Sequence, residues 1–261
     1  MEKGKTIYYT DQLNDDFSGF TAKGPVINEN WDYDDNSIGK KIKRFLIYRI
    51  LIHPIAAFYS RVIFRRKIVG KGLLKKYKHT GIFMYGNHTQ IVGDAFLQAC
   101  ITYPRTNYVL VNPANLEVPV IGKLIPALGA LPIPSTISAY RNFKAAIEDK
   151  IKRKHPVVIY PEAHIWPYYT GIRPFADTSF AYPVNLDAPV FCFVNTYKKS
   201  KIFQRPRIIT YIGGPFFPDK ELNLKSARKK MRDQVYKRMT ELASHSNVDV
   251  VRYLKKEADI G

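Results

Sequence analysis

A chain of 261 residues, 46% of them hydrophobic, is long enough to bury the core of one large domain or two small ones. Its two cysteines, Cys100 and Cys192, both lie in apolar stretches, which predicts reduced core thiols and argues against a secreted disulfide framework. The formal net charge of +19 predicts attraction to a polyanion such as nucleic acid, anionic lipid or a phosphorylated substrate, although a merely solvated basic surface has the same composition.

Residues 1–40 differ from the rest of the chain in charge. They carry eight acidic and four basic side chains, so the remainder has a net charge of +23. The segment is polar and rich in Asn, Asp and Gly, which predicts an extended or partly ordered acidic arm and not a folded unit. It contains no basic-then-apolar signal peptide, so we expect a cytoplasmic protein.

Residues 41–67 interleave aliphatic and aromatic side chains with Lys and Arg. Four residues that suit a bilayer core poorly interrupt the apolar stretch 45–64: Arg49, His53, Pro54 and Arg61. A spanning helix needs about 20 mostly apolar residues, so the segment predicts amphipathic helices that lie in the membrane interface, broken or kinked at the proline. The alternative is an amphipathic helix packed on the domain itself.

The pattern from residue 68 to 261 is typical of an α/β domain. Five apolar, β-branched or aromatic runs predict buried strands at residues 81–85, 108–112, 157–160, 190–195 and 208–213. Apolar residues at three- and four-residue spacing predict helices over 137–151 and 224–242. This alternation predicts a mixed, mostly parallel central sheet flanked by helices, with functional groups at the carboxyl ends of strands.

Residues 86–94, Gly-Asn-His-Thr-Gln-Ile-Val-Gly-Asp, follow the first of these strands. A neutral imidazole accepts a proton near neutral pH, and a carboxylate can orient the ring and stabilise its charged form. His88 and Asp94 are therefore candidate catalytic residues, although a histidine at a strand end is often a hydrogen-bonded structural residue. Glu162 follows the strand 157–160 and falls at the same edge of the sheet.

The spacing between His88 and Asp94 constrains the local backbone. In a regular helix, at about 100° per residue, side chains six positions apart point about 240° away from each other. The pair cannot meet on an undistorted helix. We expect Gly93 to absorb an extra residue in a bulge or a non-helical turn.

Four segments in this order resemble the glycerolipid acyltransferase family, the 1-acylglycerol-3-phosphate acyltransferases and their relatives. The resemblance covers roughly residues 65–215. The family has four blocks: Asn-His, four intervening residues and Asp; a Gly-apolar-Ile-Pro/Phe turn followed by Asp or Glu and Arg; Phe-Pro-Glu-Gly-Thr-Arg; and Val-Pro before an apolar strand. The gap between His88 and Asp94 is five residues, one more than in the family. The matching residues here are Asn87, His88 and Asp94, then Gly129 to Pro134, then Tyr160, Pro161 and Glu162, and finally Ala188, Pro189 and Val190.

This resemblance implies transfer of a fatty acyl group from acyl-CoA or acyl carrier protein to a hydroxyl of a lysophospholipid or related acceptor, without a metal or cofactor. It implies that His88 is the general base and that Asp94 holds its ring. Asn87 would position the turn or donate to the developing oxyanion. Glu162 would fix the acceptor or support the loop around it, or merely cap the following turn.

The chain departs from the family where the acceptor's phosphate is expected to bind. The second and third blocks of the family each carry an arginine, and Ser135 and Ile165 stand near these positions here. The Gly-Thr after the glutamate is replaced by Ala163-His164. Lys123, Arg141 and Arg173 are candidates to bind the phosphate from other directions; otherwise the acceptor is not a glycerol phosphate.

Two other functions fit parts of the pattern. A peripheral membrane protein that binds lipid without catalysis fits the altered blocks, and in either case an anionic membrane surface is the expected partner. A nucleic-acid-binding protein fits the net charge, but the sequence has no zinc, helix-turn-helix or RNA-recognition signature. We therefore expect no nucleic-acid partner.

Overall fold

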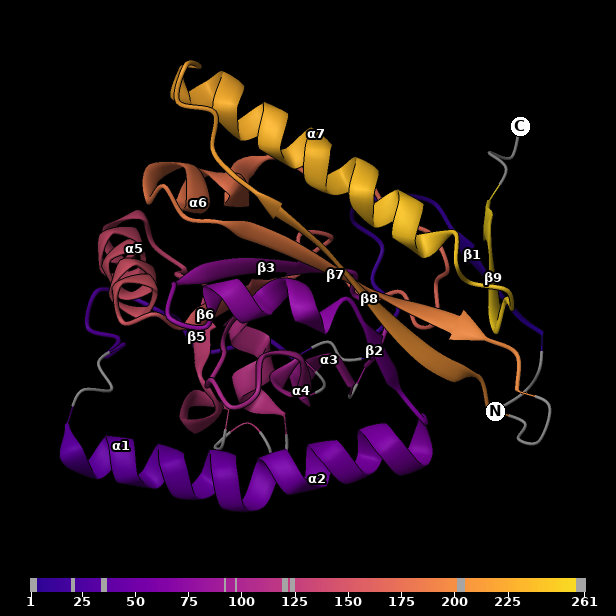
Figure 1. Ribbon diagram of the computed structural model, residues 1–261, viewed down its shortest axis with the longest axis horizontal. Helices are drawn as coiled ribbons and strands as arrows, with labels where there is room; N and C mark the ends of the chain where they lie inside the picture. The colour runs from indigo at the N-terminus through magenta and orange to yellow at the C-terminus, as the bar shows by residue number, and fades with distance from the viewer. Residues whose placement is uncertain are drawn as a thin grey trace.

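The computed structural model describes residues 4–19, 22–33, 37–91, 93–96, 98–118, 122, 125–200 and 205–256. A seven-stranded sheet in the order β2-β8-β7-β3-β6-β4-β5 forms its centre (Figure 1). Five neighbouring strands, from β7 to β5, are parallel to one another. Strand β8 runs antiparallel to β7, and β2 at the edge of the sheet is parallel to β8. The strands are β2 (Lys67–Val69), β3 (Ile82–Gly86), β4 (Tyr108–Val111), β5 (Ala130–Pro132), β6 (Pro156–Ile159), β7 (Val190–Lys198) and β8 (Arg207–Phe216).

The predicted mixed, mostly parallel sheet is confirmed. Every residue of β3 and β6 is buried, because helices cover both faces of the sheet and a strand buried on both faces reads as a continuous apolar run. The two three-residue strands β2 and β5 were not predicted. Two further strands, β1 (Lys5–Tyr9) and β9 (Val251–Lys255), pair in parallel outside the main sheet.

One face of the sheet packs against α5 (Ile137–Lys152), α6 (Ala181–Asn185) and α7 (Leu224–Ala243). Phe143 and Ile147 from α5 share a core cluster with Met231, Val235 and Met239 from α7. The predicted helices over 137–151 and 224–242 are confirmed. Short 3-10 turns connect the elements at η4 (Pro113–Glu117), η6 (Pro126–Leu128) and η7 (Thr178–Phe180).

The opposite face carries η3 (Lys71–Tyr77), α3 (Gly93–Phe96), α4 (Ala99–Thr102) and a long helix over residues 38–63, drawn below the sheet in Figure 1. That helix is composite. Its successive segments are α1 (Ile38–Phe45), the π-helical η1 (Leu46–Ile52), α2 (His53–Phe58) and the π-helical η2 (Tyr59–Ile63).

The predicted break of this helix at Pro54 is wrong, whereas the alternative, a kink at this proline, stays a prediction. The N–H of His53 still donates to the carbonyl of Tyr48, five residues back, and Pro54 stands where the π pattern changes to α. A proline has no N–H to donate, and here the missing donor falls at a position where the bonding pattern shifts in any case. The helix therefore continues through it.

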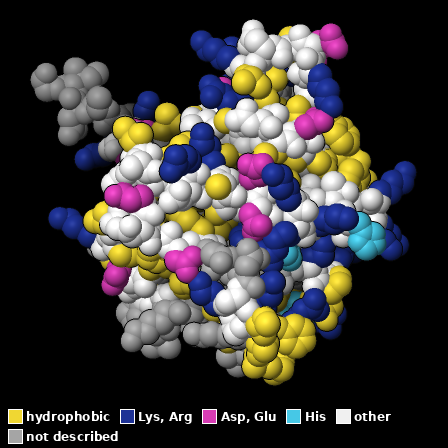
Figure 2. All heavy atoms as spheres, turned by 90° about the vertical axis from the view of Figure 1, so that its left-hand side faces the viewer, with side chains coloured by type: hydrophobic (Ala, Val, Ile, Leu, Met, Phe, Trp, Pro, Cys, Tyr) yellow, Lys and Arg dark blue, Asp and Glu magenta, His cyan; other side chains and the backbone are white. Residues whose placement is uncertain are grey.

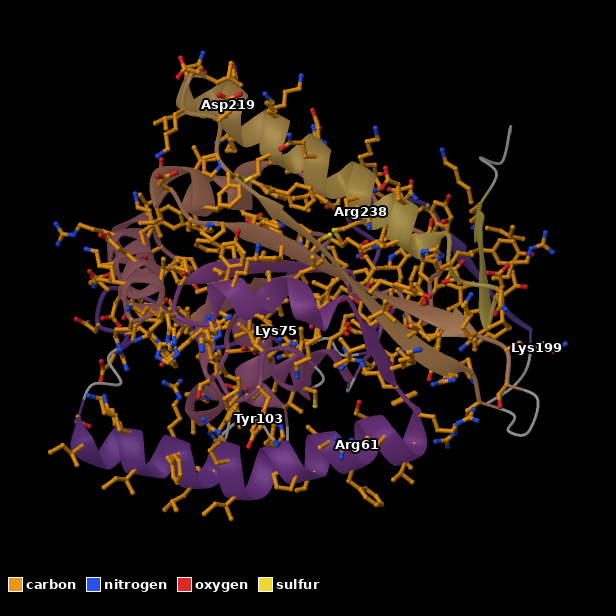
Figure 3. All side chains as sticks on the ribbon, in the orientation of Figure 1. Arg61, Lys75, Tyr103, Lys199, Asp219 and Arg238 are labelled. Carbon is orange, nitrogen blue, oxygen red and sulfur yellow. The ribbon has the colours of Figure 1, made fainter. Side chains whose placement is uncertain are left out.

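One side of the composite helix packs on the body of the protein. Tyr48, Ala56 and Ser60 are buried, Arg44 donates to the Tyr108 hydroxyl, and the His53 ring stacks on Tyr103. Figure 3 shows Tyr103 on the body above the helix, while side chains along the lower side of the helix project away from it.

The other side exposes large hydrophobic side chains along its whole length. They are 47% to 77% exposed: Ile38, Ile42, Phe45, Leu46, Ile50, Ile55, Phe58 and Val62. In Figure 2 hydrophobic side chains protrude at the lower end of the molecule, where this helix lies, with Lys and Arg beside them. The helix thus packs on the domain by one side and presents a hydrophobic stripe on the other, while its position in a membrane interface stays a prediction.

The π turns bring the two halves of this stripe to the same side. Ile42 and Phe58 are sixteen residues apart, so in a uniform α-helix at about 100° per residue they would point about 160° apart. Both are nevertheless exposed, at 55% and 64%. A π turn holds more residues than an α turn, so each residue advances the helix by a smaller angle. By length and composition this helix is also the one described helix that could cross a membrane.

The described parts of the acidic arm cross the carboxyl-end edge of the sheet. The indole of Trp166 donates to the carbonyl of Asp15 at 2.8 Å. Farther along the arm, the backbone of Ile27 exchanges hydrogen bonds with Ser135, whose N–H donates to the Ile27 carbonyl at 2.9 Å. The arm thus contacts the loops after β6 and β5.

Candidate functional site

The site lies at the carboxyl end of β3, the central strand of the sheet. Nδ1 of His88 is 2.9 Å from Oδ2 of Asp94. The same oxygen accepts the backbone N–H groups of Thr89 and Gln90, each at 2.9 Å. A carboxylate only accepts, so Nδ1 carries the proton and Nε2 presents its lone pair. This is the tautomer that a general base requires.

A non-helical segment solves the spacing problem between these two residues. Residues 87–91 carry no helical structure, and Asp94 lies in the first turn of α3. The chain therefore curls around the Asp94 carboxylate before the helix begins. Gly93 itself is the first residue of α3, so the non-helical backbone at residues 87–91 is not centred on this glycine.

Gly86 ends β3 and has a steric reason to be glycine. A Cβ atom at this position would collide with the ring of Phe193 on β7. Immediately after it, Asn87 pairs with the backbone of the neighbouring strand. The amide of Asn87 donates to the Asn195 carbonyl at 3.1 Å and accepts the Asn195 N–H at 2.8 Å. Asn87 is 1% exposed, so in this structure it holds the turn.

The His88 ring is accessible from outside. Its side chain is 17% exposed, compared with 3% for Asp94. Within the part of the chain that the structure describes, Nε2 has no hydrogen-bond partner. One face of the imidazole is covered by the ring of Tyr160. An incoming hydroxyl can therefore approach the basic nitrogen.

Glu162 and Arg173 form a buried pair behind the His88 backbone. The Glu162 carboxylate accepts the N–H of His88 and the N–H of Arg173, each at 3.1 Å. A guanidinium nitrogen of Arg173 lies 3.6 Å from the same carboxylate, and both side chains are 0% exposed. Burial raises the pKa of Glu162, and the charge of Arg173 opposes that shift. Glu162 therefore supports the loop around the site.

Arg173 lies inside the protein, where it has no exposed atom to offer a phosphate. Its guanidinium donates to the backbone carbonyls of Glu162, His164 and Gln12 and lies over the Trp166 ring. The predicted contact of Arg173 with an acceptor phosphate is therefore not supported. Arg141 is exposed on α5 and forms no recorded bond with the site within the described residues. Lys123 lies outside the described residues.

Sequence reasoning missed the side chains that hold the 87–94 loop from β7. Tyr197 bonds with the Thr89 hydroxyl at 2.8 Å and accepts the side-chain amide of Gln90 at 2.6 Å. Asn195 donates its side-chain amide to Oδ1 of Asp94 at 3.3 Å. The signal was present as polar residues that continue an otherwise apolar strand beyond Val194.

Arg66 is a further missed residue, just before β2. Its guanidinium donates to the Thr210 hydroxyl at 2.6 Å and to Oδ1 of Asn195 at 3.3 Å. Its backbone N–H donates to the Ser60 carbonyl, which ties it to the end of the composite helix. Burial lowers the pKa of Arg66, and the nearby Asp94 carboxylate opposes that shift.

The arrangement can perform proton transfer at Nε2 of His88. Among the described residues, no group of three or more His, Cys, Asp and Glu side chains is placed to hold a metal ion. The oriented imidazole offers a basic nitrogen at this site.

No protein-family model and no curated protein sequence matches this chain. The fold does match a solved structure, the 1-acyl-sn-glycerophosphate (LPA) acyltransferase PlsC from Thermotoga maritima. The TM-score is 0.55 and the sequence identity is 15%, and the match covers 80% of this chain and 85% of that one. At this identity the likeness establishes a shared fold, in agreement with the resemblance of the sequence blocks.

Proposed function

We propose that this protein is a membrane-associated acyltransferase, which moves a fatty acyl group from a thioester to the hydroxyl of a lysophospholipid or related acceptor. The observation that carries the proposal is the His88–Asp94 pair, with a 2.9 Å contact at Nδ1 and an accessible Nε2, at the carboxyl end of the central parallel strand. The fold shared with an LPA acyltransferase supports the reaction class. The donor is acyl-CoA or acyl carrier protein.

In the proposed reaction Nε2 of His88 removes the proton of the acceptor hydroxyl as its oxygen attacks the thioester carbonyl. The new C–O bond forms, the tetrahedral intermediate collapses and the C–S bond breaks. The thiolate then takes the proton from the imidazolium, so the base is regenerated. Asp94 stabilises the positive ring between these steps.

The composite helix supports the membrane part of the proposal. A stripe of exposed Ile, Leu, Phe and Val side chains on a helix that is tied to the body along its other side suits insertion into the headgroup region. The surrounding Lys and Arg suit an anionic lipid surface. The protein would thus be peripheral on the cytoplasmic side, with the acyl chain in lipid and the thioester arriving from the cytosol.

The test is transfer by the purified protein on vesicles of phosphatidylglycerol and phosphatidylcholine. Palmitoyl-CoA or palmitoyl acyl carrier protein is the donor, a panel of lysolipids and monoacylglycerol are the acceptors, and mass spectrometry identifies the lipids formed. His88→Ala should reduce turnover by about 10² to 10⁴-fold. The matched control is His164→Ala, which alters a half-exposed histidine outside the pair. Vesicle binding without any transfer would favour a lipid-binding protein that lacks catalysis.

A further inference from the structure

We propose that Asn195 and Arg66 are positioning residues that fix the Asp94 carboxylate for its work on His88. The proposal rests on the acyl-transfer function above only for its kinetic consequence. The geometry that carries it is a continuous hydrogen-bonded chain, in which Arg66 and Thr210 bond Asn195, Asn195 bonds Asp94, and Asp94 bonds His88.

The two oxygens of Asp94 have different partners. Oδ2 accepts three N–H groups, from the His88 ring and from the backbones of Thr89 and Gln90. Oδ1 accepts the side-chain amide of Asn195 at 3.3 Å, the one partner that the described residues give it. Rotation of the carboxylate about its own axis is thus opposed from two directions, on the loop side and on the β7 side.

The amide of Asn195 can face Asp94 in one orientation only. A guanidinium has donors and no acceptor, so the amide atom that faces Arg66 at 3.3 Å must be the oxygen. The Thr210 hydroxyl accepts a bond from Arg66 and has one proton, which goes to the same Asn195 oxygen at 2.7 Å. The nitrogen is left to face the carboxylate. Arg66 and Thr210 therefore determine that Asp94 meets a donor.

Because these side chains are buried, the loss of one hydrogen-bond partner is costly. Asn195, Thr210 and Asp94 are 2%, 0% and 3% exposed. At such depth, water cannot replace a lost partner, and a reversed amide would set two acceptors against each other. Arg66 also places a positive charge on the far side of Asn195, which offsets the buried negative charge of Asp94.

Several other ionisable groups surround the pair. Tyr160 lies against His88 from the end of β6, and Tyr197 reaches the loop from β7. Glu162, with Arg173 behind it, lies below the His88 backbone, and Cys100 on α4 is near Arg66. None of these groups donates to Oδ1 of Asp94 among the described residues. The test therefore changes Asn195 and Arg66 and leaves these groups in place.

The test compares Asn195→Asp, Arg66→Met and Thr196→Val. Asn195→Asp can still accept from Arg66 and Thr210 but turns a second carboxylate oxygen toward Asp94. Arg66→Met removes the donor and its charge. Thr196→Val is the matched control, because it removes a buried hydroxyl from the neighbouring position of β7, where the bond goes to the Ile209 carbonyl and not to the site.

Two readouts separate positioning from folding. The first is the pH dependence of kcat/KM for acyl transfer. The second is NMR titration of ring-labelled histidine, in which His88→Ala identifies the His88 signal and which needs no activity. We expect the acid limb and the His88 titration to move to higher pH in both site variants, by about one unit or more, because each leaves more negative charge beside the ring. Thr196→Val should leave both curves in place.

The possible results are distinct. Unchanged His88 titration in folded Asn195→Asp and Arg66→Met would overturn the positioning roles, whether or not the protein transfers acyl groups. Absent transfer with shifted titration would overturn the acyltransferase function and leave the positioning roles intact. Arg66 is half-buried, so Arg66→Met provides the decisive titration if Asn195→Asp fails to fold.

Discussion

The ring of Tyr160 lies against the imidazole of His88, with centroids 4.4 Å apart and planes inclined by 19°, while its hydroxyl donates to the backbone carbonyl of Asp94 at 2.8 Å. One side chain thus touches both members of the pair. Burial raises the pKa of the Tyr160 hydroxyl well above its ordinary value, so it remains a donor at neutral pH.

Separating these two contacts gives the first prediction. Tyr160→Phe keeps the ring against His88 and loses the bond to Asp94, so we expect the free energy of unfolding to fall by about 0.5 to 1.5 kcal/mol. Tyr160→Leu also removes the stacked ring, so we expect it to lose more transfer activity than Tyr160→Phe. Urea unfolding and initial rates measure the two effects. Equal activity of both variants would show that the stacked ring does not matter for catalysis.

The buried Glu162 predicts a pH-dependent stability. Its pKa is raised in the folded protein, so the unfolded chain loses this proton at lower pH than the folded one does. The contribution of Glu162 to stability is therefore present at low pH and is lost as pH rises through the interval between the unfolded and folded pKa values. Urea unfolding across about pH 4 to 8 measures this contribution as the free energy of unfolding of wild type minus that of Glu162→Gln. We expect this difference to fall as pH rises. A difference that grows with pH would contradict the predicted direction.

The burial of Arg173 predicts that its loss affects folding and not substrate affinity. Arg173→Met leaves the Glu162 carboxylate and three backbone carbonyls without their partner, and removal of one member of a buried pair costs about 3 to 5 kcal/mol. The measurement is urea unfolding together with the KM for each acceptor. A stable variant with a raised KM for phosphorylated acceptors would restore the predicted phosphate contact. Arg141→Met, at an exposed position, is the control for loss of positive charge.

The backbone of Ala163 predicts a stabilising substitution beside the site. Its φ is 62°, in the left-handed region that favours glycine, which costs an L-residue about 1 to 2 kcal/mol. Ala163→Gly should raise the free energy of unfolding by up to about 1 kcal/mol after the entropy cost of glycine. Ala181→Gly, at a φ of −61°, should lower it by about the same amount. The two variants differ in sign because the same change meets different backbone conformations.

The hydrophobic stripe predicts where charge abolishes membrane binding. Ile50→Glu and Phe58→Glu, at side chains that are both 64% exposed, should reduce co-sedimentation with anionic vesicles and leave the fold intact. Ile137→Glu is the control, because Ile137 is 95% exposed but belongs to α5 and not to the composite helix. Equal loss of binding in all three variants would indicate a general charge effect and remove the role of the stripe.

The sequence predicted the fold best for the strands that are packed on both faces, because their residues have to be apolar. The runs at 81–85 and 157–160 predicted β3 and β6 because helices cover both faces of the sheet. The short strands β2 and β5 were missed, since three residues are too few to establish a period. The continuity of the helix through Pro54 was also missed, because propensity alone does not reveal π turns.

For the site, the sequence indicated the candidate catalytic residues but not the side chains that support them. His88 and Asp94 lie on one short segment, although the gap between them is one residue longer than in the family. Asn195 reaches Asp94 from β7, and Arg66 reaches Asn195 from the residue before β2, so only the strand order brings these side chains to the same edge. Arg173 was identified from the sequence as a candidate, since it follows Glu162 closely. Its inward orientation, which removes it from contact with a substrate, is evident only in the structure.

The π turns make the length of the composite helix as important as its composition. Removing one residue from Leu46–Ile52 could restore ordinary α geometry without breaking the helix, yet the segment before the deletion would then swing around the axis relative to the rest. Ile38 and Ile42 would then point away from the side on which Ile55 and Phe58 are exposed. A one-residue deletion that a surface loop would tolerate would here divide the hydrophobic stripe between two sides of the helix.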